Sequence, residues 1–464
     1  MHQPVLATPQ IPTDVASLRS SIAGDVYVPG DAGYDEARQA WNLYADQRPS
    51  VIVMPESAID VVKAVRFARA EGLRVAPQGT GHGASSLESL EGTMLLKTTR
   101  MRRVDIYPSS RTARAEAGAE WHEVTIPAAE HGLAALAGSA ADVGVVGYTL
   151  GGGMGWLARR HGLAADSVTA VEIVTPDGRL VRADADNEPE LLWAVRGGGG
   201  QVGIVTAIEF TLYPVRELYA GTLFFPIERS AEVLHAWREW TATVPEEVTS
   251  VGRILQFPPI PDLPDFLSGK RFVVVEAAYL GDEFEGAELI RPLRELGPEM
   301  DTFAMIPAPA LQELHMDPPQ PVPYTGEGQM LGRLDGEAID RFVAAAGPQS
   351  SSPLVSAEIR HVGGALSRPQ AHHGALSTFD AEFLTFGVGM VMDDAMEQAN
   401  RAQLTKLAEA FAPYENGRQY LNFTESHTDP ARFYTPTVYR RLREVKAAYD
   451  PTEVFRSNHP IPPA

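Results

Sequence analysis

The sequence predicts an α+β protein with more than one domain, and three observations lead to this fold class. The chain has 464 residues, which at roughly 150 residues per domain is enough for two or three domains. Hydrophobic residues make up 44% and charged residues 21%, values of ordinary globular proteins that exclude a wholly disordered chain. Helix-like and strand-like stretches alternate in the first half, and glycine becomes scarce after about residue 217.

Charge and missing residue types exclude several classes of function. The 39 Lys and Arg against 60 Asp and Glu give a formal charge of −21, which argues against nucleic acid as a partner. No apolar run approaches the ~18 residues of a membrane span. The absence of cysteine excludes disulfides, thiolate zinc sites and cysteine nucleophiles, and no metal site is expected. The N-terminus lacks the pattern of a signal peptide, so we expect a cytoplasmic protein.

Local patterns predict the elements of the first half. Residues 57–71 carry apolar residues at helical spacing, with Ser57 and Asp60 as a capping box, and Gly72 ends this helix. A short apolar strand at 73–76 follows. The elements expected next are a strand at 93–97, a helix at 119–130, a hairpin at 168–183 and a strand at 204–212.

The second half has a different texture. It carries long amphipathic helices, one of which places Val233, Trp237 and Trp240 on one face. Near the end, Thr435 and Pro436 start a helix that closes before Pro451. We therefore expect three parts along the chain, at 1–216, 217–415 and 416–464, the last returning to the first.

The strongest chemical signal is the loop PQGTGHGAS at 77–85, directly after the strand 73–76. Three glycines within five residues let consecutive backbone amides approach an anionic ligand such as a pyrophosphate. The loop is not a P-loop, because no Gly-Lys-Ser/Thr follows it. It also lacks the helix start and the acidic residue of the nicotinamide fingerprint.

Two further glycine clusters join this loop. They read GSAADVGVVGYTLGGGMG at 138–155 and RGGGGQVG at 196–203. So many glycines in one half would weaken the fold unless the backbone there wraps a large flat molecule. Three loops converging on one elongated cofactor is the economical interpretation, and three unrelated irregular loops is the alternative.

Together these motifs resemble a known family, and the resemblance covers nearly the whole chain. It starts with VYVPGD at 26–31 and continues through the GTGHG loop, the run GVVGYTLGGGMGWLARRHGLAADSV and LLWAVRGGGGQVGIVT, to FRSNH at 455–459. The sequence is similar to the FAD-linked oxidases of the vanillyl-alcohol oxidase superfamily, in the berberine-bridge-enzyme-like branch. This implies a two-domain PCMH-type FAD-binding fold whose substrate domain is an antiparallel sheet backed by helices. The FAD domain would be 1–216 completed by 416–464, and the substrate domain 217–415.

The resemblance implies that FAD is the cofactor and that His82 is bonded to its 8α-methyl group, as an 8α-histidyl linkage. An ordinary turn histidine is the alternative. The second, cysteine-borne bond of bicovalent relatives is excluded, because Ala140 stands at that position. The resemblance assigns flavin contacts to residues of the three loops and the C-terminal segment: Gln78, Gly79, Thr80, Gly81, His82, Gly83, Ser139, Val143, Gly144, Gly147, Tyr148, Gly152, Gly200, Val205 and Asn458.

Two of these positions carry further implications. Relatives with valine at the position of Val143 tend to admit oxygen to the flavin, which favours an oxidase, although valine is also a common core filler. Many relatives have histidine at the position of Tyr148. The tyrosine hydroxyl could donate a hydrogen bond that stabilises charge on the reduced ring, or the residue could serve packing only.

Candidate catalytic residues lie in two segments. Glu358, Arg360 and His361 fall in an expected strand, where relatives place an active-site carboxylate, and period two puts Glu358 and Arg360 on one face. Tyr420 and Asn422 belong to a Tyr-Leu-Asn-Phe run that resembles the Tyr-x-Asn-Tyr motif, from which relatives draw a tyrosine base. Each could instead be a buried, satisfied polar residue.

The resemblance implies an oxidase that transfers a hydride from a small alcohol, sugar or cyclic amine to flavin, with O2 as the second substrate and hydrogen peroxide as product. The alternatives are a dehydrogenase or oxidative cyclase that reacts poorly with O2, and a flavin-binding module without turnover. A nicotinamide-dependent reductase is disfavoured because no second nucleotide fingerprint occurs. Neither the physiological substrate nor the oligomeric state follows from the sequence.

Overall fold

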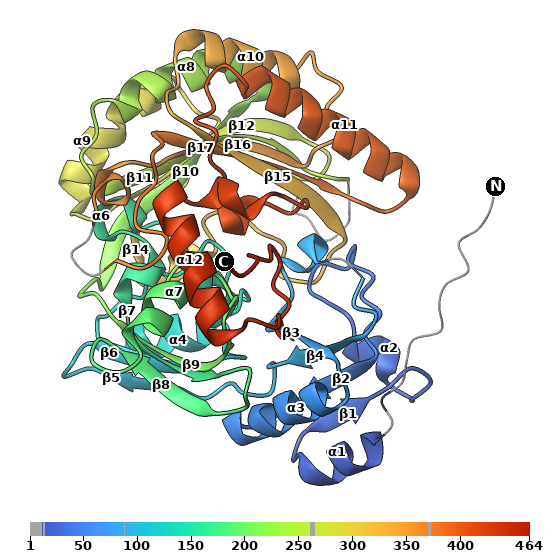
Figure 1. Cartoon of the computed structure of the whole chain (residues 1–464). Coiled ribbons are helices and arrows are strands. Elements are labelled where there is room, and N and C mark those ends of the chain that lie inside the picture. The colour runs from blue at the N-terminus through green and yellow to red at the C-terminus, as the bar shows by residue number, and fades with distance from the viewer. Residues whose placement is uncertain (1–11, 13, 88, 260–264, 370–372) are drawn as a thin grey trace.

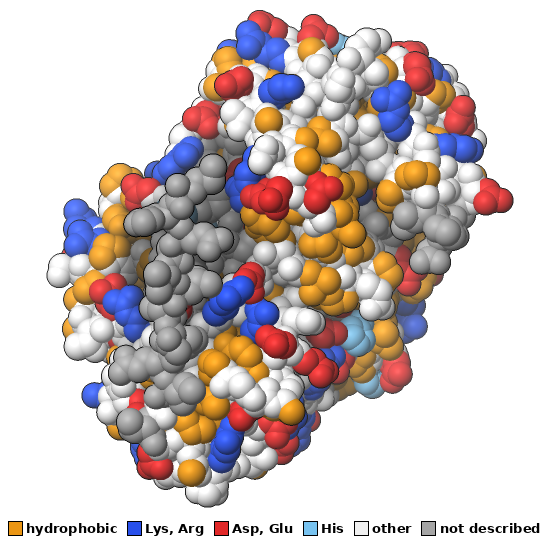
Figure 2. Space-filling model, turned by 90° about the vertical axis from the view of Figure 1, so that its right-hand side faces the viewer, with side chains coloured by type: hydrophobic (Ala, Val, Ile, Leu, Met, Phe, Trp, Pro, Cys, Tyr) orange, Lys and Arg blue, Asp and Glu red, His pale blue; other side chains and the backbone are white. Residues whose placement is uncertain are grey.

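The computed structural model describes residues 12, 14–87, 89–259, 265–369 and 373–464 (Figure 1). The N-terminal stretch inspected for a targeting signal lies mostly outside the described residues. Two small sheets occupy one end of the molecule and a large sheet the other (Figure 1). Within the described parts of the chain, no helix is long and apolar enough to cross a membrane. On the face seen in Figure 2, acidic and basic side chains are interspersed and form no basic stripe.

The first small sheet has the strand order β1-β2-β4-β3. Its strands are β1 (Asp25–Tyr27), β2 (Val51–Met54), β3 (Arg74–Gln78) and β4 (Thr93–Lys97). β2 and β3 both run parallel to β4, which requires a crossover, and helix α3 (Ala58–Ala70) provides it. The predicted helix and both predicted strands are confirmed. The capping box is wrong: Ser57 caps the amide of Asp60, but the Asp60 carboxylate accepts from the amides of Ala23 and Glu56.

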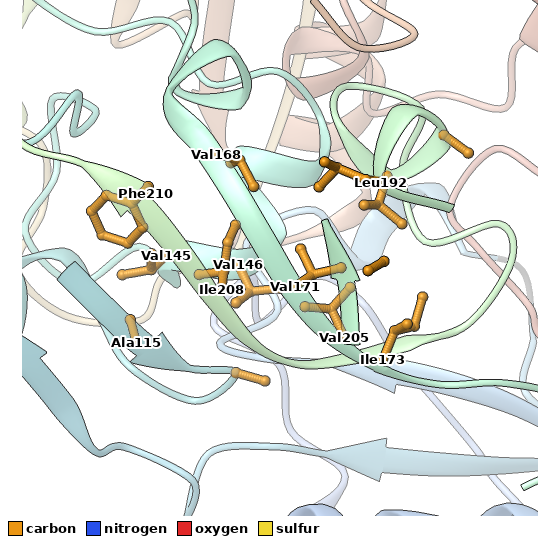
Figure 3. Close-up of a cluster of buried hydrophobic side chains, with 14 of the residues drawn as sticks. Ala115, Val145, Val146, Val168, Val171, Ile173, Leu192, Val205, Ile208 and Phe210 are labelled. Atoms are coloured by element: carbon orange, nitrogen blue, oxygen red, sulfur yellow. The ribbon is translucent and has the colours of Figure 1, made fainter. Parts of the chain in front are cut away.

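The second small sheet is antiparallel, with the order β5-β6-β9-β7-β8. Its strands are β5 (Val104–Tyr107), β6 (Thr112–Glu116), β7 (Val168–Val174), β8 (Leu180–Asp184) and β9 (Ile204–Thr211). The predicted 168–183 hairpin is confirmed as β7 and β8. Apolar residues of β7 and β9 point into one cluster, which includes Val171, Ile173, Val205, Ile208 and Phe210 (Figure 3). Val205 and Ile208 share this face although they are three residues apart, because the β7–β9 pairing shifts register between them.

The large sheet begins at residue 217 and is antiparallel throughout. Its order is β13-β10-β12-β11-β16-β17-β15, with β14 also paired to β10. The strands are β10 (Glu217–Pro226), β11 (Val248–Gln256), β12 (Arg271–Tyr279), β13 (Met300–Asp301), β14 (Ala304–Pro307), β15 (Tyr324–Leu331), β16 (Ser356–His361) and β17 (Phe383–Met390). This is the helix-backed antiparallel sheet that the resemblance implied.

Four helices cover one face of the large sheet (Figure 1). They are α8 (Ser230–Thr241), α9 (Glu283–Arg294), α10 (Gly336–Ala346) and α11 (Asp394–Phe411). Trp237 and Phe342 are fully buried against strand residues such as Val273 and Ile359. The other face of the sheet therefore stays available to the two small sheets and the loops between them.

The remaining helices are short except for the last. They are α1 (Val15–Ser21), α2 (Tyr34–Ala37), α4 (Trp121–Ala129), α5 (Val145–Leu150), α6 (Ala158–His161), α7 (Pro189–Val195) and α12 (Pro436–Tyr449). Single 3-10 turns are η1 (Ala84–Ser86), η2 (Ala164–Ser167), η3 (Ile227–Arg229), η4 (Ala308–Gln312), η5 (Gly364–Ser367), η6 (Leu421–Phe423) and η7 (Pro430–Phe433). Thr435 caps α12 as predicted, and Leu442 and Val445 pack into the cluster of the five-stranded sheet. The C-terminal segment thus returns to the first half (Figure 1).

Candidate active site

The glycine-rich loop 79–83 leaves the end of β3 and is held by the chain near residue 41. The amides of Trp41 and Asn42 donate to the carbonyls of Thr80 (2.9 Å) and Gly81 (3.4 Å). Gly81 has φ +90°, and a Cβ there would lie 2.8 Å from Ala40 Cβ, so this position requires glycine. The loop is therefore built to bring its backbone close to a neighbour.

His82 sits on this loop with its imidazole ring held from several sides. Its Nδ1 lies 2.8 Å from Thr80 Oγ1, and its ring stacks on Trp41 with centroids 4.1 Å apart. Asp142, which accepts a 2.5 Å hydrogen bond from Trp41 Nε1, places Oδ1 3.7 Å from His82 Nε2. Burial lowers the pKa of His82 to about 4. The imidazole is consequently neutral at pH 7, as a nucleophile or ligand must be.

The second glycine loop contacts both the first and the third. Gly144 precedes α5, and a Cβ on it would lie 3.7 Å from Thr80. The amide of Gly199 donates to the carbonyl of Leu150 at the end of α5. The predicted flavin residues of these two loops are Ser139, Val143, Gly144, Gly147, Tyr148, Gly152 and Gly200, and the contacts show that the loops carrying them are neighbours.

Two predicted flavin residues lie elsewhere. Asn458 returns from the C-terminal segment and donates from Nδ2 to the carbonyl of Gly83 at 2.6 Å. Val205 lies on β9 with its side chain inside the apolar cluster of Figure 3, where it is 4% exposed. The side chain of Val205 therefore serves packing, which leaves its backbone for any contact with a ligand.

Tyr420 and Asn422 lie on the chain entering η6, next to the second glycine loop. Asn422 Nδ2 donates to the Tyr148 carbonyl (2.9 Å) and to the Tyr420 hydroxyl (3.2 Å). Burial raises the pKa of Tyr420, while hydrogen bonds from the amides of Gly153 and Met154 and from Asn422 oppose the rise. Several donors thus converge on one buried phenol oxygen.

Glu358 and Arg360 share one face of β16, as period two predicts, and belong to a buried network. Arg360 Nε donates to Glu358 Oε1 (2.6 Å), and Glu358 Oε2 lies 2.9 Å from His315 Nε2. His315 Nδ1 lies 2.6 Å from Glu276 Oε2, and Arg253 Nη1 donates to Glu276 Oε1 (2.9 Å). Burial alone would raise the pKa of Glu358, but Arg360 and His315 lower it. Glu358 is therefore an ionised structural partner of Arg360 at neutral pH.

His361 is separated from this pair, on the opposite face of β16. Its ring stacks on Phe383 with centroids 5.4 Å apart, and Arg159 donates to it. Burial, and next the charge of Arg159, lower the pKa of His361 to about 3. A neutral imidazole that accepts from an arginine is poorly suited to take a proton from a substrate.

The residues around the glycine loops fit FAD, and the test is whether their buried polar atoms lack hydrogen-bond partners. Several polar atoms near the loops are buried and have no hydrogen-bond partner among the residues that the structure describes, namely both amide atoms of Gln78, Nε2 of His82 and the Tyr148 hydroxyl. Buried polar atoms are normally satisfied, so orphaned ones mark groups that await a ligand. A long cofactor with many acceptors and donors would satisfy them, and the neutral His82 faces the same space.

Sequence reasoning missed several residues of the site. Asp142 lies within the second glycine cluster, but the sequence did not predict that Asp142 and Trp41 contact His82. No sequence pattern indicated the network of Arg253, Glu276 and His315. These residues lie in three separate segments and meet only in the folded structure. Tyr324, whose hydroxyl donates to the His82 carbonyl (3.0 Å), lies 242 residues from it in sequence.

Comparison with known proteins agrees with this geometry. The model of the FAD binding domain family matches residues 49–184, and that of the berberine and berberine-like family matches residues 419–462. The chain is similar to the FAD-linked oxidoreductase YvdP of Bacillus subtilis, with 28% identity covering 96% of this chain and 99% of the relative. It is also similar to (R)-6-hydroxynicotine oxidase of Paenarthrobacter nicotinovorans, with 29% identity covering 96% and 97%.

Solved structures support the same fold. BBE-like 1 of Physcomitrella patens, as a variant, superposes with a TM-score of 0.84 at 21% identity, covering 97% of this chain and 99% of that one. The 6-hydroxy-D-nicotine oxidase of Arthrobacter nicotinovorans gives 0.82 at 25% identity, covering 96% and 99%. The fold is the two-domain PCMH-type FAD-binding fold. The chain therefore carries an FAD binding domain and a berberine-like C-terminal segment. It is an enzyme, similar to FAD-linked oxidoreductases over 96% of its length.

Proposed function

We propose that this FAD-linked oxidoreductase is an oxidase that holds its flavin through one covalent bond to His82. The observation that carries the proposal is the neutral, partly buried His82, whose Nε2 is shielded from solvent and has no hydrogen-bond partner within the described residues. When bound, FAD supplies an acceptor for a hydride and can pass two electrons to O2. A single tether is expected because Ala140 occupies the position of the second anchor in bicovalent relatives.

The chain's own residues would prepare the reaction around that acceptor. Burial raises the pKa of Tyr420, so it is a neutral phenol at pH 7 and would have to release its own proton before it could take one from the substrate. The amides of Gly153 and Met154 together with Asn422 would stabilise the phenolate that forms. The positive charge of Arg360 acts in the same direction, since it too favours the ionised form of Tyr420. Glu358 fixes Arg360 through their 2.6 Å hydrogen bond and is a positioning residue in this proposal.

The proposal names the substrate only as a small organic molecule. Small alcohols, sugars and cyclic amines all fit hydride transfer to flavin, and relatives bear names such as (R)-6-hydroxynicotine oxidase. A free amine would need no base, so the Tyr420 arrangement favours an alcohol or a sugar. The expected use of O2, the cytoplasmic location and the assigned flavin contacts remain predictions.

Acid precipitation of the purified protein tests the tether. Yellow colour should stay with the pellet of the wild type and be lost from the pellet of His82→Ala, because that variant lacks the nucleophilic nitrogen. His122→Ala is the matched control, since His122 is another partly buried histidine outside the loop. Colour that pellets equally with His82→Ala would refute the assignment. Rapid reoxidation of the reduced protein by air, with release of peroxide, would separate an oxidase from a dehydrogenase.

A further inference from the structure

Arg159 is a buried cation without an anionic partner. It lies on α6, is 6% exposed, and forms no ion pair with any residue that the structure describes. Its neighbour Arg160 is the contrast: that side chain is 47% exposed and pairs with Glu246 at 2.5 Å. A guanidinium removed from water without a counter-charge is strongly unfavourable, so an unpaired one in a native fold calls for a ligand.

The groups that pack around Arg159 do not neutralise it. The hydrogen-bond acceptor that it has is His361 (2.8 Å), whose lowered pKa keeps it uncharged. Burial lowers the pKa of Arg159 to about 10, and the charges of Glu246 and Glu247 only partly offset this effect. Glu246 already binds both Arg160 and Arg368, and Glu247 lies 3.5 Å from Arg160.

Arg159 faces a recess between the loop after the second glycine cluster and strands β11 and β16. No carboxylate is among the described residues that line it. Two buried donors on its wall, Arg159 Nε and Trp156 Nε1, have no hydrogen-bond partner in the described parts of the chain. Arg360 and Ser139 also line it. The wall therefore offers positive charge and unused N–H groups, and an occupant must supply acceptors and negative charge.

We propose that this recess is a subsite for an anionic group of the substrate, a carboxylate held by Arg159 and Trp156. The inference rests on the proposed function, because it adds a substrate class to the same site. Arg360 connects the two regions: it lines the recess, and its charge acts on Tyr420. A small organic acid bound there would have its remaining carbon atoms beside the proposed base. Arg159 is thus a specificity-determining residue.

Calorimetric titration of the purified holoprotein with benzoate, and with benzamide as its uncharged counterpart, tests the subsite. Benzoate should bind at least tenfold more tightly than benzamide to the wild type. Arg159→Gln should weaken benzoate by about ten- to hundredfold, the range for loss of a charge-assisted hydrogen bond. Arg160→Gln, the same change one residue away on the surface, should leave the affinity unchanged.

Equal binding of benzoate and benzamide, or unchanged affinity in Arg159→Gln, would overturn the proposal. If Arg159→Gln does not fold, the proposal is tested by the ratio of benzoate affinity to benzamide affinity, measured in the wild type and in Arg159→Lys. Flavin content is measured on the same samples. Absence of flavin would refute the proposed function, whereas the titration tests the anion subsite independently.

Discussion

The buried ion pair between Lys446 and Asp450 should be a major anchor of the C-terminal segment. The two side chains lie one turn apart at the end of α12, at 2% and 0% exposure, with Nζ and Oδ2 2.6 Å apart. Lys446 also donates to the Gln201 carbonyl (2.7 Å), within the third glycine cluster. Asp450 in addition accepts from the amides of Val454 (2.8 Å) and Phe455 (3.1 Å). The pair thus ties helix, glycine loop and C-terminal tail together.

Asp450→Asn keeps the size of the side chain but leaves the Lys446 ammonium buried without a counter-charge. Breaking one side of such a pair costs about 3–5 kcal/mol. The matched control is Glu337→Gln, because Glu337 and Arg341 form an (i,i+4) pair of similar length (2.7 Å) at 66% and 43% exposure. For the exposed pair we expect a much smaller loss of stability, because water and salt screen the attraction between its charges.

Native-state hydrogen exchange measures both effects where they act. Amide protection in α12 should fall about a hundredfold or more in Asp450→Asn, whereas amides of α10 should change by less than about threefold in Glu337→Gln. The double variant Lys446→Met with Asp450→Asn should regain most of the loss, because no charge is then left unpaired. A loss in Asp450→Asn no larger than that of the control would refute the reasoning.

Three further predictions concern the site. Tyr420→Phe should slow flavin reduction by substrate about 10²- to 10⁴-fold if Tyr420 is the base, and an unchanged rate in stopped-flow would remove it from that role. Gly81→Ala should lower the thermal midpoint and flavin retention more than Gly72→Ala, because both have positive φ but only the Cβ at Gly81 meets Ala40; equal effects would contradict the steric argument. The folded pKa of His82, about 4, lies below the ordinary 6.5, so the unfolded chain binds the proton first as pH falls. Stability from this group is complete above pH 6.5 and is lost towards pH 4. Denaturant unfolding should show that the flavin-free wild type loses about 3 kcal/mol more unfolding free energy than His82→Gln as the pH falls from 6.5 to 4. Parallel curves of unfolding free energy against pH for the two proteins would contradict this prediction.

The sequence by itself determined the local elements and the glycine loops. Helix α3, the β7–β8 hairpin, the apolar face of α8 and the capped start of α12 follow from apolar spacing, turn residues and caps, which act within a few residues along the chain. The order of the motifs along the chain was also enough to predict the resemblance to FAD-linked oxidases and the fold that it implies. Where a local rule failed, as at Asp60, a distant amide (Ala23) had taken the carboxylate instead.

Only the tertiary structure decided which polar groups meet. Trp41, His82 and Asp142 come from three segments, and their contacts depend on how the loops pack. The network of Arg253, Glu276 and His315 and the unpaired charge of Arg159 likewise arise from strand order in the large sheet and its contact with α6. The physical reason is that burial and pairing are properties of the assembled neighbours. A sequence pattern shows that a residue can carry charge, and the fold decides whether that charge has a partner.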